Sequence, residues 1–549
     1  MKLVGAKQFW GPWLRRVSTW ESVVTIAVAV LAVAVRLFFW YYTRRTWEDA
    51  LITLQHAENA ARGLGLTHVP GGPHVHGFTS PISVLIPLLG ELAHPGFGLA
   101  MMRIASAVCG GITVWIAMQI SRRLGLAFPI SLLIGGHLAI EHQQILFGMA
   151  GMESQVAVTI LLFSIYTLFD LKPLKVGVGL GLCMLARPDF VLWVAIVIGL
   201  LGWRCWKDHD LRPLGTISLA LLLVYGPWLA FATWYFGSPI PNTILAKAWG
   251  YGSRWYVGLS ASPLIWEILG RTLKIFATLG PVYEGNGATL SYLTFGIPIS
   301  FFMTLFVVLG IAVAVTRKGL PLIAIAGFAL VYFLYFLLIG HVFPWYCVPL
   351  VAVAVIIAGI GLDALLRDCF AERWRAILGY ALAVAYLGSF VAVTAETFRA
   401  ERNVQVFVED GVRKQAGLYL AGVMRPDETV GSEPLGYVGY YSRHVVFDYP
   451  GLCNRQVVRF FRDHPTKRSL IDMLAYFRPD YIVLRPFEYL SGLNNGHSWL
   501  SSDYQQVAVF RIPDDKRALL LFPEGNIDLE FYVLKRKSSS GEEHSPAPH

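Results

Sequence analysis

Long apolar runs, separated by short segments that carry arginine and lysine, constrain this chain more than any other feature. A helix needs about 20 mostly apolar residues to cross the hydrocarbon core of a bilayer, and the first such run covers residues 23–42. Of the 549 residues, 55% are hydrophobic and only 15% are charged, against about 25% charged residues in an average soluble domain. A soluble chain of this length cannot bury so much apolar surface. The sequence therefore predicts a polytopic α-helical membrane protein.

The apolar runs predict eleven transmembrane helices. They are residues 23–42, 103–121, 127–145, 154–171, 174–186, 190–203, 214–234, 291–315, 320–340, 345–366 and 376–395. Five clusters of arginine and lysine lie between consecutive runs, and such clusters are typical of cytoplasmic loops. The clusters are Arg122-Arg123, Lys172/Lys175, Arg204/Lys207/Arg212, Arg317-Lys318 and Arg367/Arg373/Arg375. With all five in the cytoplasm, the N-terminus lies inside and the C-terminus outside.

The composition divides the chain into three parts. Residues 1–395 form the predicted transmembrane domain, and its first outer segment, 43–102, contains juxtamembrane helices, among them the short apolar stretch 81–93. Over residues 396–535, helix-like and strand-like patterns alternate, which predicts an extracytoplasmic α/β domain. Residues 536–549 lack an apolar pattern and predict a disordered tail.

Charge and cysteine content exclude several other functions. The net charge of +9 fits basic cytoplasmic loops, so no nucleic-acid partner is predicted. The six cysteines contain no CxxC pair, which indicates neither a zinc site nor a disulfide framework. His74 and His76 lie in a loop rich in glycine and proline, and we interpret them as solvated loop residues. We predict no cofactor, and we do not favour a divalent metal.

Two adjacent carboxylates, Glu48 and Asp49, follow the first predicted span where it leaves the membrane. Ionisable residues close to bilayer depth are costly and commonly functional. Two carboxylates close together raise one pKa, which suits a general base, and a helix beginning here would place Thr53 and His56 on the face of Asp49. The alternative is that the pair stabilises a helix N-terminus through the helix dipole. The local sequence does not separate these two interpretations.

Ionisable residues recur at the other outer hairpin tips of this weakly charged chain. They are Glu153, Arg187, Asp189, Lys247 and His341. Arg187 can hold a phosphate or pair with Asp189, and the local sequence slightly favours the ion pair. Lys247 can complement a lipid phosphate or extend to the interface as a snorkelling side chain. Together these residues favour a site at the membrane–water boundary for a substrate with a lipid anchor and a polar head.

Several short motifs follow one another in a fixed order. They are Trp47-Glu48-Asp49-Ala50-Leu51-Ile52-Thr53, Arg62-Gly63-Leu64-Gly65-Leu66, Gly77-Phe78-Thr79-Ser80-Pro81, Gly151-Met152-Glu153-Ser154, Arg187-Pro188-Asp189, Gly237-Ser238-Pro239-Ile240-Pro241-Asn242 and Phe447-Asp448-Tyr449-Pro450-Gly451-Leu452. In this order the motifs resemble those of the GT-C membrane glycosyltransferases. Within that class they are similar to the terminal arabinofuranosyltransferase AftB group and its bacterial relatives. The resemblance covers about residues 40–460.

The resemblance implies a GT-C type fold and the transfer of a single sugar from a polyprenyl-phosphate-linked donor, with inversion at the anomeric carbon. In the AftB group that sugar is arabinofuranose. The resemblance also implies a bacterial plasma (inner) membrane with the active site on its periplasmic side. The acceptor hydroxyl belongs to a glycan, a lipopolysaccharide or a protein. Three rival functions stay open: a flippase for lipid-linked sugars without catalysis, a glycan polymerase or ligase that uses lipid-linked donors, and a transferase that uses a polyprenyl-phosphate hexose.

The resemblance also suggests roles for individual residues. The acidic pair of the family falls on Glu48 and Asp49, so one of these two is expected to be the general base. We expect four side chains at the outer tips to bind the donor: Arg187, Lys247, Glu153 and His341. We expect five others to bind the acceptor: Thr53, His76, Asp189, Asn242 and Asp448. A phosphate leaving group departs as a stable anion and needs nearby positive charge rather than a general acid.

Overall fold

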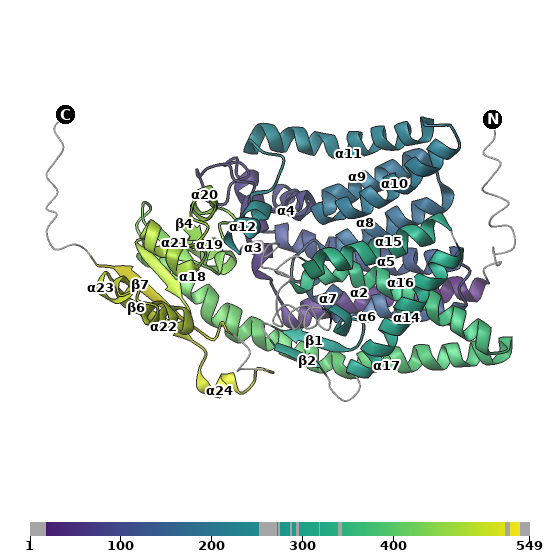
Figure 1. The fold of residues 1–549 in the computed structure, drawn as a ribbon. Coiled ribbons are helices and arrows are strands. Elements are labelled where there is room, and N and C mark those ends of the chain that lie inside the picture. The colour runs from purple at the N-terminus through teal and green to yellow at the C-terminus, as the bar shows by residue number, and fades with distance from the viewer. Residues whose placement is uncertain are drawn as a thin grey trace.

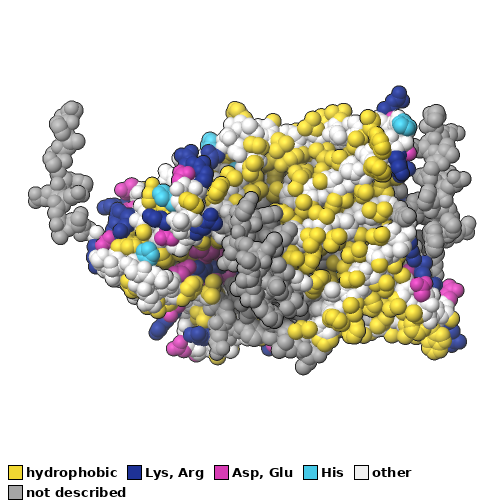
Figure 2. All heavy atoms as spheres, viewed as in Figure 1, with side chains coloured by type: hydrophobic (Ala, Val, Ile, Leu, Met, Phe, Trp, Pro, Cys, Tyr) yellow, Lys and Arg dark blue, Asp and Glu magenta, His cyan; other side chains and the backbone are white. Residues whose placement is uncertain are grey.

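The computed structural model describes residues 18–251, 272, 275–285, 288–291, 296–317, 319–338, 343–521 and 527–537. It has two parts: a bundle of long helices, and a C-terminal α/β domain at one end of this bundle (Figure 1). Apolar side chains cover the flank of the bundle, whereas charged side chains gather over the C-terminal domain and at the opposite end (Figure 2). This distribution is that of a multi-pass membrane protein.

Within the described ranges, eight helices are long and apolar enough to cross a membrane. They are α2 (Thr19–Thr43), α5 (Gly98–Arg123), the Pro188–Lys207 segment that contains α10 (Val191–Lys207), α11 (Arg212–Phe236), α14 (Gly296–Arg317), α15 (Leu320–Leu338), α16 (Pro344–Cys369) and α17 (Glu372–Asn403). Each coincides with a predicted span. The other three predicted spans fall on shorter helices: α6 (Phe128–Ile140), α8 (Ser154–Asp170) and α9 (Pro173–Ala186). By length and composition the described helices therefore support eight spans, three fewer than predicted.

The predicted span 127–145 is interrupted by a polar residue within an apolar run. Glu141 ends α6, and its carboxylate accepts hydrogen bonds from the backbone N–H groups of Gln143 and Gln144. This capping starts a new short helix, α7 (His142–Met149). The apolar run is continuous in sequence, but the helix is not.

The centre of the bundle is α16, because 94% of the residues in its most apolar stretch are buried. It packs against α14 through two glycines. A Cβ atom at Gly310 would lie 2.0 Å from the carbonyl oxygen of Ile357, and one at Gly361 would lie 2.2 Å from that of Phe306. Glycine is required at both positions because the two backbones approach so closely.

Three short helices lie at the end of the bundle that faces the C-terminal domain: α3 (Glu48–Ala61), α4 (Pro81–Ala93) and α12 (Asn242–Gly250). The hydroxyl group of Ser80 caps α4 by accepting a hydrogen bond from the backbone of Ser83, and Pro81 occupies its first turn. This helix has the bounds of the apolar stretch predicted as juxtamembrane.

The C-terminal domain contains a five-stranded sheet with the strand order β4-β3-β5-β7-β6. The strands are β3 (Thr429–Ser432), β4 (Val445–Asp448), β5 (Tyr481–Leu484), β6 (Tyr504–Arg511) and β7 (Glu530–Arg536). Strands β4, β3 and β5 are parallel, and β7 and β6 are antiparallel. The helices of the domain are α18 (Lys414–Val423), α19 (Leu435–Ser442), α20 (Arg455–Asp463), α21 (Leu470–Phe477), α22 (Pro486–Asn494), α23 (Trp499–Ser502) and α24 (Asp514–Arg517). The predicted α/β domain is confirmed.

The bundle and the C-terminal domain are joined by one continuous helix. Helix α17 continues into a π-helical segment (Val404–Arg413) and then into α18. The predicted domain boundary between residues 395 and 396 falls within α17, so no flexible linker separates the two parts. The predicted tail begins at Arg536, which ends β7, and residues 538–549 lie outside the described residues.

A small antiparallel hairpin of β1 (Val282–Gly285) and β2 (Ala288–Ser291) precedes α14.

Candidate functional site

Two cavities meet at the first turn of α3, between the bundle and the C-terminal domain. The bundle cavity, of about 60 Å³, is lined by α3, by the segment that leads into α4 and by hairpin tips of the bundle. The interdomain cavity, of about 410 Å³, is lined by the first turn of α3 and by side chains of the C-terminal domain. Five residues line both cavities: Asp49, Ile52, Lys247, Trp345 and Leu452.

The start of α3 is held in place by backbone contacts from the bundle. Arg103 of α5 donates hydrogen bonds to the carbonyl oxygens of Met149 (2.9 Å) and Arg45 (2.6 Å). The backbone N–H of Trp47 donates to the carbonyl oxygen of Ala150 at 2.9 Å. The acidic pair therefore follows a segment that is attached to α5 and to the hairpin tip at residues 149–150.

Asp49 lies where the two cavities meet. Within the described part of the chain, its carboxylate accepts no hydrogen bond and forms no ion pair. Burial raises the pKa of Asp49, and the positive charge of Lys247 acts in the opposite direction. A buried carboxylate whose lone pairs are not occupied by protein donors is well suited to accept a proton from a bound molecule.

The surroundings of Glu48 are different, because both of its carboxylate oxygens contact the C-terminal domain. One oxygen accepts a hydrogen bond from the backbone N–H of Gly436 at 3.0 Å, and the other lies 2.9 Å from Nη1 of Arg413. Burial raises the pKa of Glu48, and Arg413 opposes that change. Glu48 thus links the first turn of α3 to the domain and lines only the interdomain cavity, whereas Asp49 lines both cavities.

Arg187 brings positive charge to the bundle cavity. Its Nε lies 3.0 Å from Asp189 Oδ1, and its Nη1 lies 3.5 Å from Glu153 Oε1. The hydroxyl group of Tyr332 donates a hydrogen bond to the other Asp189 oxygen at 2.6 Å. The ion pair favoured by the local sequence is therefore present, yet Arg187 and Glu153 also line the cavity, and Asp189 lines neither cavity.

Lys247, on α12, brings a second positive charge. Its Nζ donates a hydrogen bond to the hydroxyl group of Tyr346 at 2.8 Å and lies over the ring of Phe343 at 5.4 Å. Burial alone would lower the pKa of Lys247, but Tyr346 and Asp49 outweigh it and raise that pKa. The amine is therefore held in its charged form beside the proposed proton acceptor.

Four of the five predicted acceptor-binding residues line neither cavity, and the structure gives all four of them other contacts. The side-chain amide of Asn242 donates hydrogen bonds to the carbonyl oxygens of Gly451 (2.8 Å) and Leu452 (3.0 Å). The carboxylate of Asp448 accepts from the backbone of Leu452 and Cys453, and burial raises its pKa to about 7. These contacts fix the loop that places Leu452 between the two cavities.

The other predicted acceptor residues are also accounted for. His76, interpreted from the sequence as a solvated loop residue, is instead buried and stacked on Phe236, with ring centroids 4.6 Å apart. Burial lowers its pKa to about 3. Thr53 lines the bundle cavity rather than the interdomain cavity. His341, predicted to bind the donor, lies outside the described residues.

The interdomain cavity is rich in buried ion pairs. Arg45 lies 2.8 Å from Glu401 and 3.0 Å from Glu409. Asp528 lies 2.6 Å from Arg413 and 2.7 Å from Arg485. Removal of one partner of such a pair strongly destabilises the folded protein, because an uncompensated charge stays buried. The network therefore holds the domain on the bundle in a defined position.

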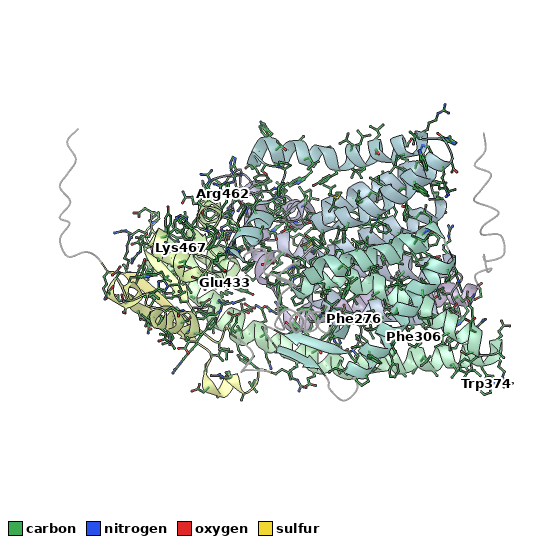
Figure 3. The ribbon with its side chains drawn as sticks, in the orientation of Figure 1. Phe276, Phe306, Trp374, Glu433, Arg462 and Lys467 are labelled. Atoms are coloured by element: carbon green, nitrogen blue, oxygen red, sulfur yellow. The ribbon has the colours of Figure 1, made fainter. Side chains whose placement is uncertain are left out.

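Several residues of the site were not predicted from the sequence. Those of the C-terminal domain are Arg413, Glu433, Arg485 and Asp528, and Figure 3 labels Glu433 on the side of the domain that faces the bundle. Glu433 directly follows β3, at the carboxyl end of two parallel strands. That position is where α/β sheets commonly bind ligands, so the end of this strand is the sequence signal that points to Glu433.

Within the described ranges, no group of three or more histidine, cysteine, aspartate or glutamate side chains is arranged to hold a metal ion.

Comparisons with known proteins cover the domain and the whole chain separately. A family model described as a domain of unknown function (DUF8728) matches residues 397–532. No curated protein matches the sequence. ArnT from Cupriavidus metallidurans, solved with bound undecaprenyl phosphate, superposes with a TM-score of 0.54 at 13% identity, over 95% of this chain and 99% of that one.

The oligosaccharyltransferase of Archaeoglobus fulgidus in the apo form gives a TM-score of 0.55 at 12% identity, over 89% of this chain and 72% of that one. The archaeal oligosaccharyltransferase AglB from Archaeoglobus fulgidus, in complex with an inhibitory peptide and a dolichol-phosphate, gives a TM-score of 0.53 at 12% identity. The superposition covers 88% of this chain and 71% of that one. At these identities the similarity establishes the fold, which is GT-C-like, with a C-terminal mixed α/β domain as in ArnT. It does not distinguish the AftB group within that class.

Proposed function

We propose that the protein transfers a single sugar from a polyprenyl-phosphate-linked donor to an acceptor hydroxyl, with inversion and with Asp49 as the general base. The observation that carries this proposal is the position of Asp49. Its carboxylate accepts no hydrogen bond from the described residues. It borders the bundle cavity, which is lined by the cationic side chains of Arg187 and Lys247, and also the interdomain cavity.

The bundle cavity suits the phosphate of the donor. Arg187 and Lys247 both line it, and arginine and lysine are common phosphate ligands. The two neighbouring folds were solved with undecaprenyl phosphate and with a dolichol-phosphate, which supports a lipid phosphate as the ligand of this fold. Glu153 and Thr53 line the same cavity, and we propose that they contact the sugar hydroxyls.

The interdomain cavity suits the acceptor. Its wall combines aromatic rings, among them Tyr251, Tyr449 and Trp345, with the carboxylate of Glu433. Aromatic faces and carboxylates together can stack on and hydrogen-bond to a carbohydrate. An acceptor in this cavity would bring its hydroxyl group to Asp49 from the side opposite the donor phosphate.

The reaction then follows from the two positions. Asp49 takes the proton of the acceptor hydroxyl, and the acceptor oxygen forms a bond to the anomeric carbon. The bond between that carbon and the phosphate oxygen breaks, and its electron pair leaves with the polyprenyl phosphate. Attack from the opposite face inverts the configuration. The positive charges of Arg187 and Lys247 stabilise the leaving phosphate, so the proposal needs neither a general acid nor a metal ion.

The finer assignments follow from the motif order. We propose arabinofuranose as the sugar, a bacterial plasma membrane as the location and its periplasmic side as the side of the reaction. The acceptor is a hydroxyl group of a glycan, a lipopolysaccharide or a protein.

The test is a transfer assay with the purified full-length protein in lipid nanodiscs. The donors are synthetic polyprenyl-phosphoryl-arabinofuranose and matched polyprenyl-phosphoryl hexoses, the acceptor is a short arabinoside, and one arm contains EDTA. We expect one added pentose by mass spectrometry, its loss in Asp49→Asn, and its retention in Asp463→Asn, a matched change at an exposed carboxylate of α20.

Each other outcome changes a specific part of the proposal. Product from a hexose donor alone would keep the enzyme class and discard arabinose. Loss of product with EDTA would contradict the metal-free mechanism. Absence of product with every donor, in protein shown to be folded, together with movement of labelled donor between leaflets, would identify a flippase instead.

A further inference from the structure

A separate cavity of about 460 Å³ lies at the end of the bundle opposite the C-terminal domain. It is formed where α2, α6 and α17 begin and where α5 and α16 end. Figure 3 labels Trp374 at this end of the bundle and Glu433 on the domain at the other end. The whole length of the helices therefore separates this cavity from the candidate active site.

Three arginines from different helices line this cavity. Arg122 donates a hydrogen bond to the hydroxyl group of Thr25 at 2.8 Å, while its buried Nε has no hydrogen-bond partner among the described residues. Arg367 lies 2.6 Å from Asp363. The guanidinium of Arg375 forms no ion pair within the described residues. Arg122 and Arg375 thus each have guanidinium N–H groups that can donate a hydrogen bond to a ligand.

The N-terminus of α6 also faces the cavity. Its N-cap residue, Ala127, provides no side-chain hydrogen bond to the first turn, and its residues Phe128 and Pro129 line the wall. Ser131, in the same turn, lines the wall as well. It is only 1% exposed, and its Oγ has no hydrogen-bond partner in the part of the chain that the structure describes. A helix N-terminus favours an anion, and a buried, unpaired hydroxyl donor indicates a polar ligand.

Charge and shape restrict the ligand further. The three arginines share the cavity with Glu21 and Glu372, and Asp363 already pairs with Arg367. The wall is therefore close to neutral overall, and attraction of an anion depends on local groups: the guanidinium of Arg375, the Nε of Arg122 and the N-terminus of α6. The wall also contains the apolar side chains of Leu126 and Phe128, and exposed aromatic side chains flank it on α17: Trp374 at 58% and Tyr380 at 41% exposure. Aromatic side chains of this kind are typical of the membrane–water interface.

We propose that this cavity binds the phosphodiester headgroup of a membrane phospholipid. The phosphate lies against Arg375, Arg122 and the first turn of α6, and the hydroxyl group of Ser131 donates to a phosphate oxygen. The acyl chains lie along the apolar flank of α17. This site is independent of the proposed transferase reaction, because none of its residues lines either cavity near α3.

The experiment is native mass spectrometry of the purified full-length protein. The probes are dioleoylphosphatidylglycerol, dioleoylglycerol as the phosphate-free analogue, and inorganic phosphate. We expect one tightly retained phosphatidylglycerol per protein, no retained dioleoylglycerol, and no displacement by millimolar phosphate.

The variants locate the site. Arg375→Gln is expected to lower occupancy by the phospholipid about fivefold, and Arg375→Glu should lower it further because it replaces attraction by repulsion. Arg373→Gln and Arg373→Glu are the matched controls, since Arg373 is exposed on the same helix and does not line the cavity. Ser131→Ala, which removes only the buried hydroxyl group, is expected to weaken retention by a smaller factor.

Three results would overturn the proposal. Equal retention by the Arg375 and Arg373 variants would show that the lipid binds elsewhere. Retention of dioleoylglycerol would show that the phosphate is not recognised. Displacement by inorganic phosphate would identify a free-phosphate site instead of a lipid site.

Discussion

The bundle cavity and the interdomain cavity share five wall residues, yet they are built in different ways. Most of the bundle cavity comes from hairpin tips and short helices of the bundle, and its wall contains motif residues from Asp49 to Arg187. The interdomain cavity depends on side chains of the C-terminal domain, which are held by ion pairs such as Arg413 with Glu48. The first cavity is therefore a property of the membrane fold, and the second is a property of how the domain docks.

Under the proposed function, this difference allows related proteins of one fold to bind the same type of donor and different acceptors. A lipid phosphate needs only fixed cations near the bilayer, which the bundle provides. An acceptor of variable structure can be accommodated by changes in the domain, without disturbance of Asp49. Effects on donor use and on acceptor use should therefore be separable by substitutions on the two sides.

The largest effect is expected at the residue where the cavities meet. Asp49→Asn removes the proton acceptor and should lower kcat about a thousandfold, with donor binding retained. Glu48→Gln should lower kcat far less, because Glu48 lines only the interdomain cavity and both of its carboxylate oxygens are already occupied by Gly436 and Arg413. Steady-state kinetics of the two neighbours are the measurement. A larger loss in Glu48→Gln, in protein of unchanged thermal stability, would exchange their roles.

A smaller effect is expected on the donor side. Arg187→Gln removes one of two cations from the bundle cavity and should lower kcat/KM for the donor about a hundredfold, while KM for the acceptor stays unchanged. The measurement is a two-substrate kinetic analysis. Arg204→Gln is the matched control, since Arg204 is 42% exposed at the other end of α10. An equal change in acceptor KM would mean that the two cavities do not act separately.

A still smaller effect is expected on the acceptor side. Glu433→Gln should raise KM for the acceptor about tenfold, by weakening one charge-assisted hydrogen bond, and should leave donor KM unchanged. Glu488→Gln is a close control, because both carboxylates pair with Arg485, at 2.6 Å and 2.8 Å, but only Glu433 lines the cavity. Similar kinetics for the two variants would attribute the effect to domain stability rather than to acceptor contact.

The same contrast explains how much the sequence predicted. The long helices and the hairpin-tip residues Asp49, Glu153, Arg187 and Lys247 follow from local signals, since apolar length defines spans and ionisable residues at membrane boundaries are unusual. The partners of Glu48 could not be predicted in this way. Arg413 lies 365 positions further along the chain, and its approach to α3 depends on the docking of the whole domain.

Two other differences have local physical causes. The polar residue Glu141 divides a run that is apolar on average, so hydropathy alone joined α6 and α7 into one span. Asn242 and Asp448 are polar residues in motifs, which suggested contact with a substrate, but their side chains hold the backbone of one loop. A motif residue can be required for the geometry of a site without contact with the substrate.

The smallest effect concerns pH and tests whether Lys247 acts on both sides. The charge of Lys247 lowers the pKa of Asp49, so Lys247→Gln should raise that pKa. A general base acts in its deprotonated form, and the acidic limb of kcat/KM against pH should therefore move to higher pH. Loss of the cation at the leaving phosphate would in addition reduce the rate by a factor that does not depend on pH. The pH profile separates the two contributions, with Lys414→Gln as the control, because Lys414 lines neither cavity. A reduced rate with an unmoved acidic limb would assign Lys247 to the donor phosphate alone and would leave the pKa of Asp49 to burial.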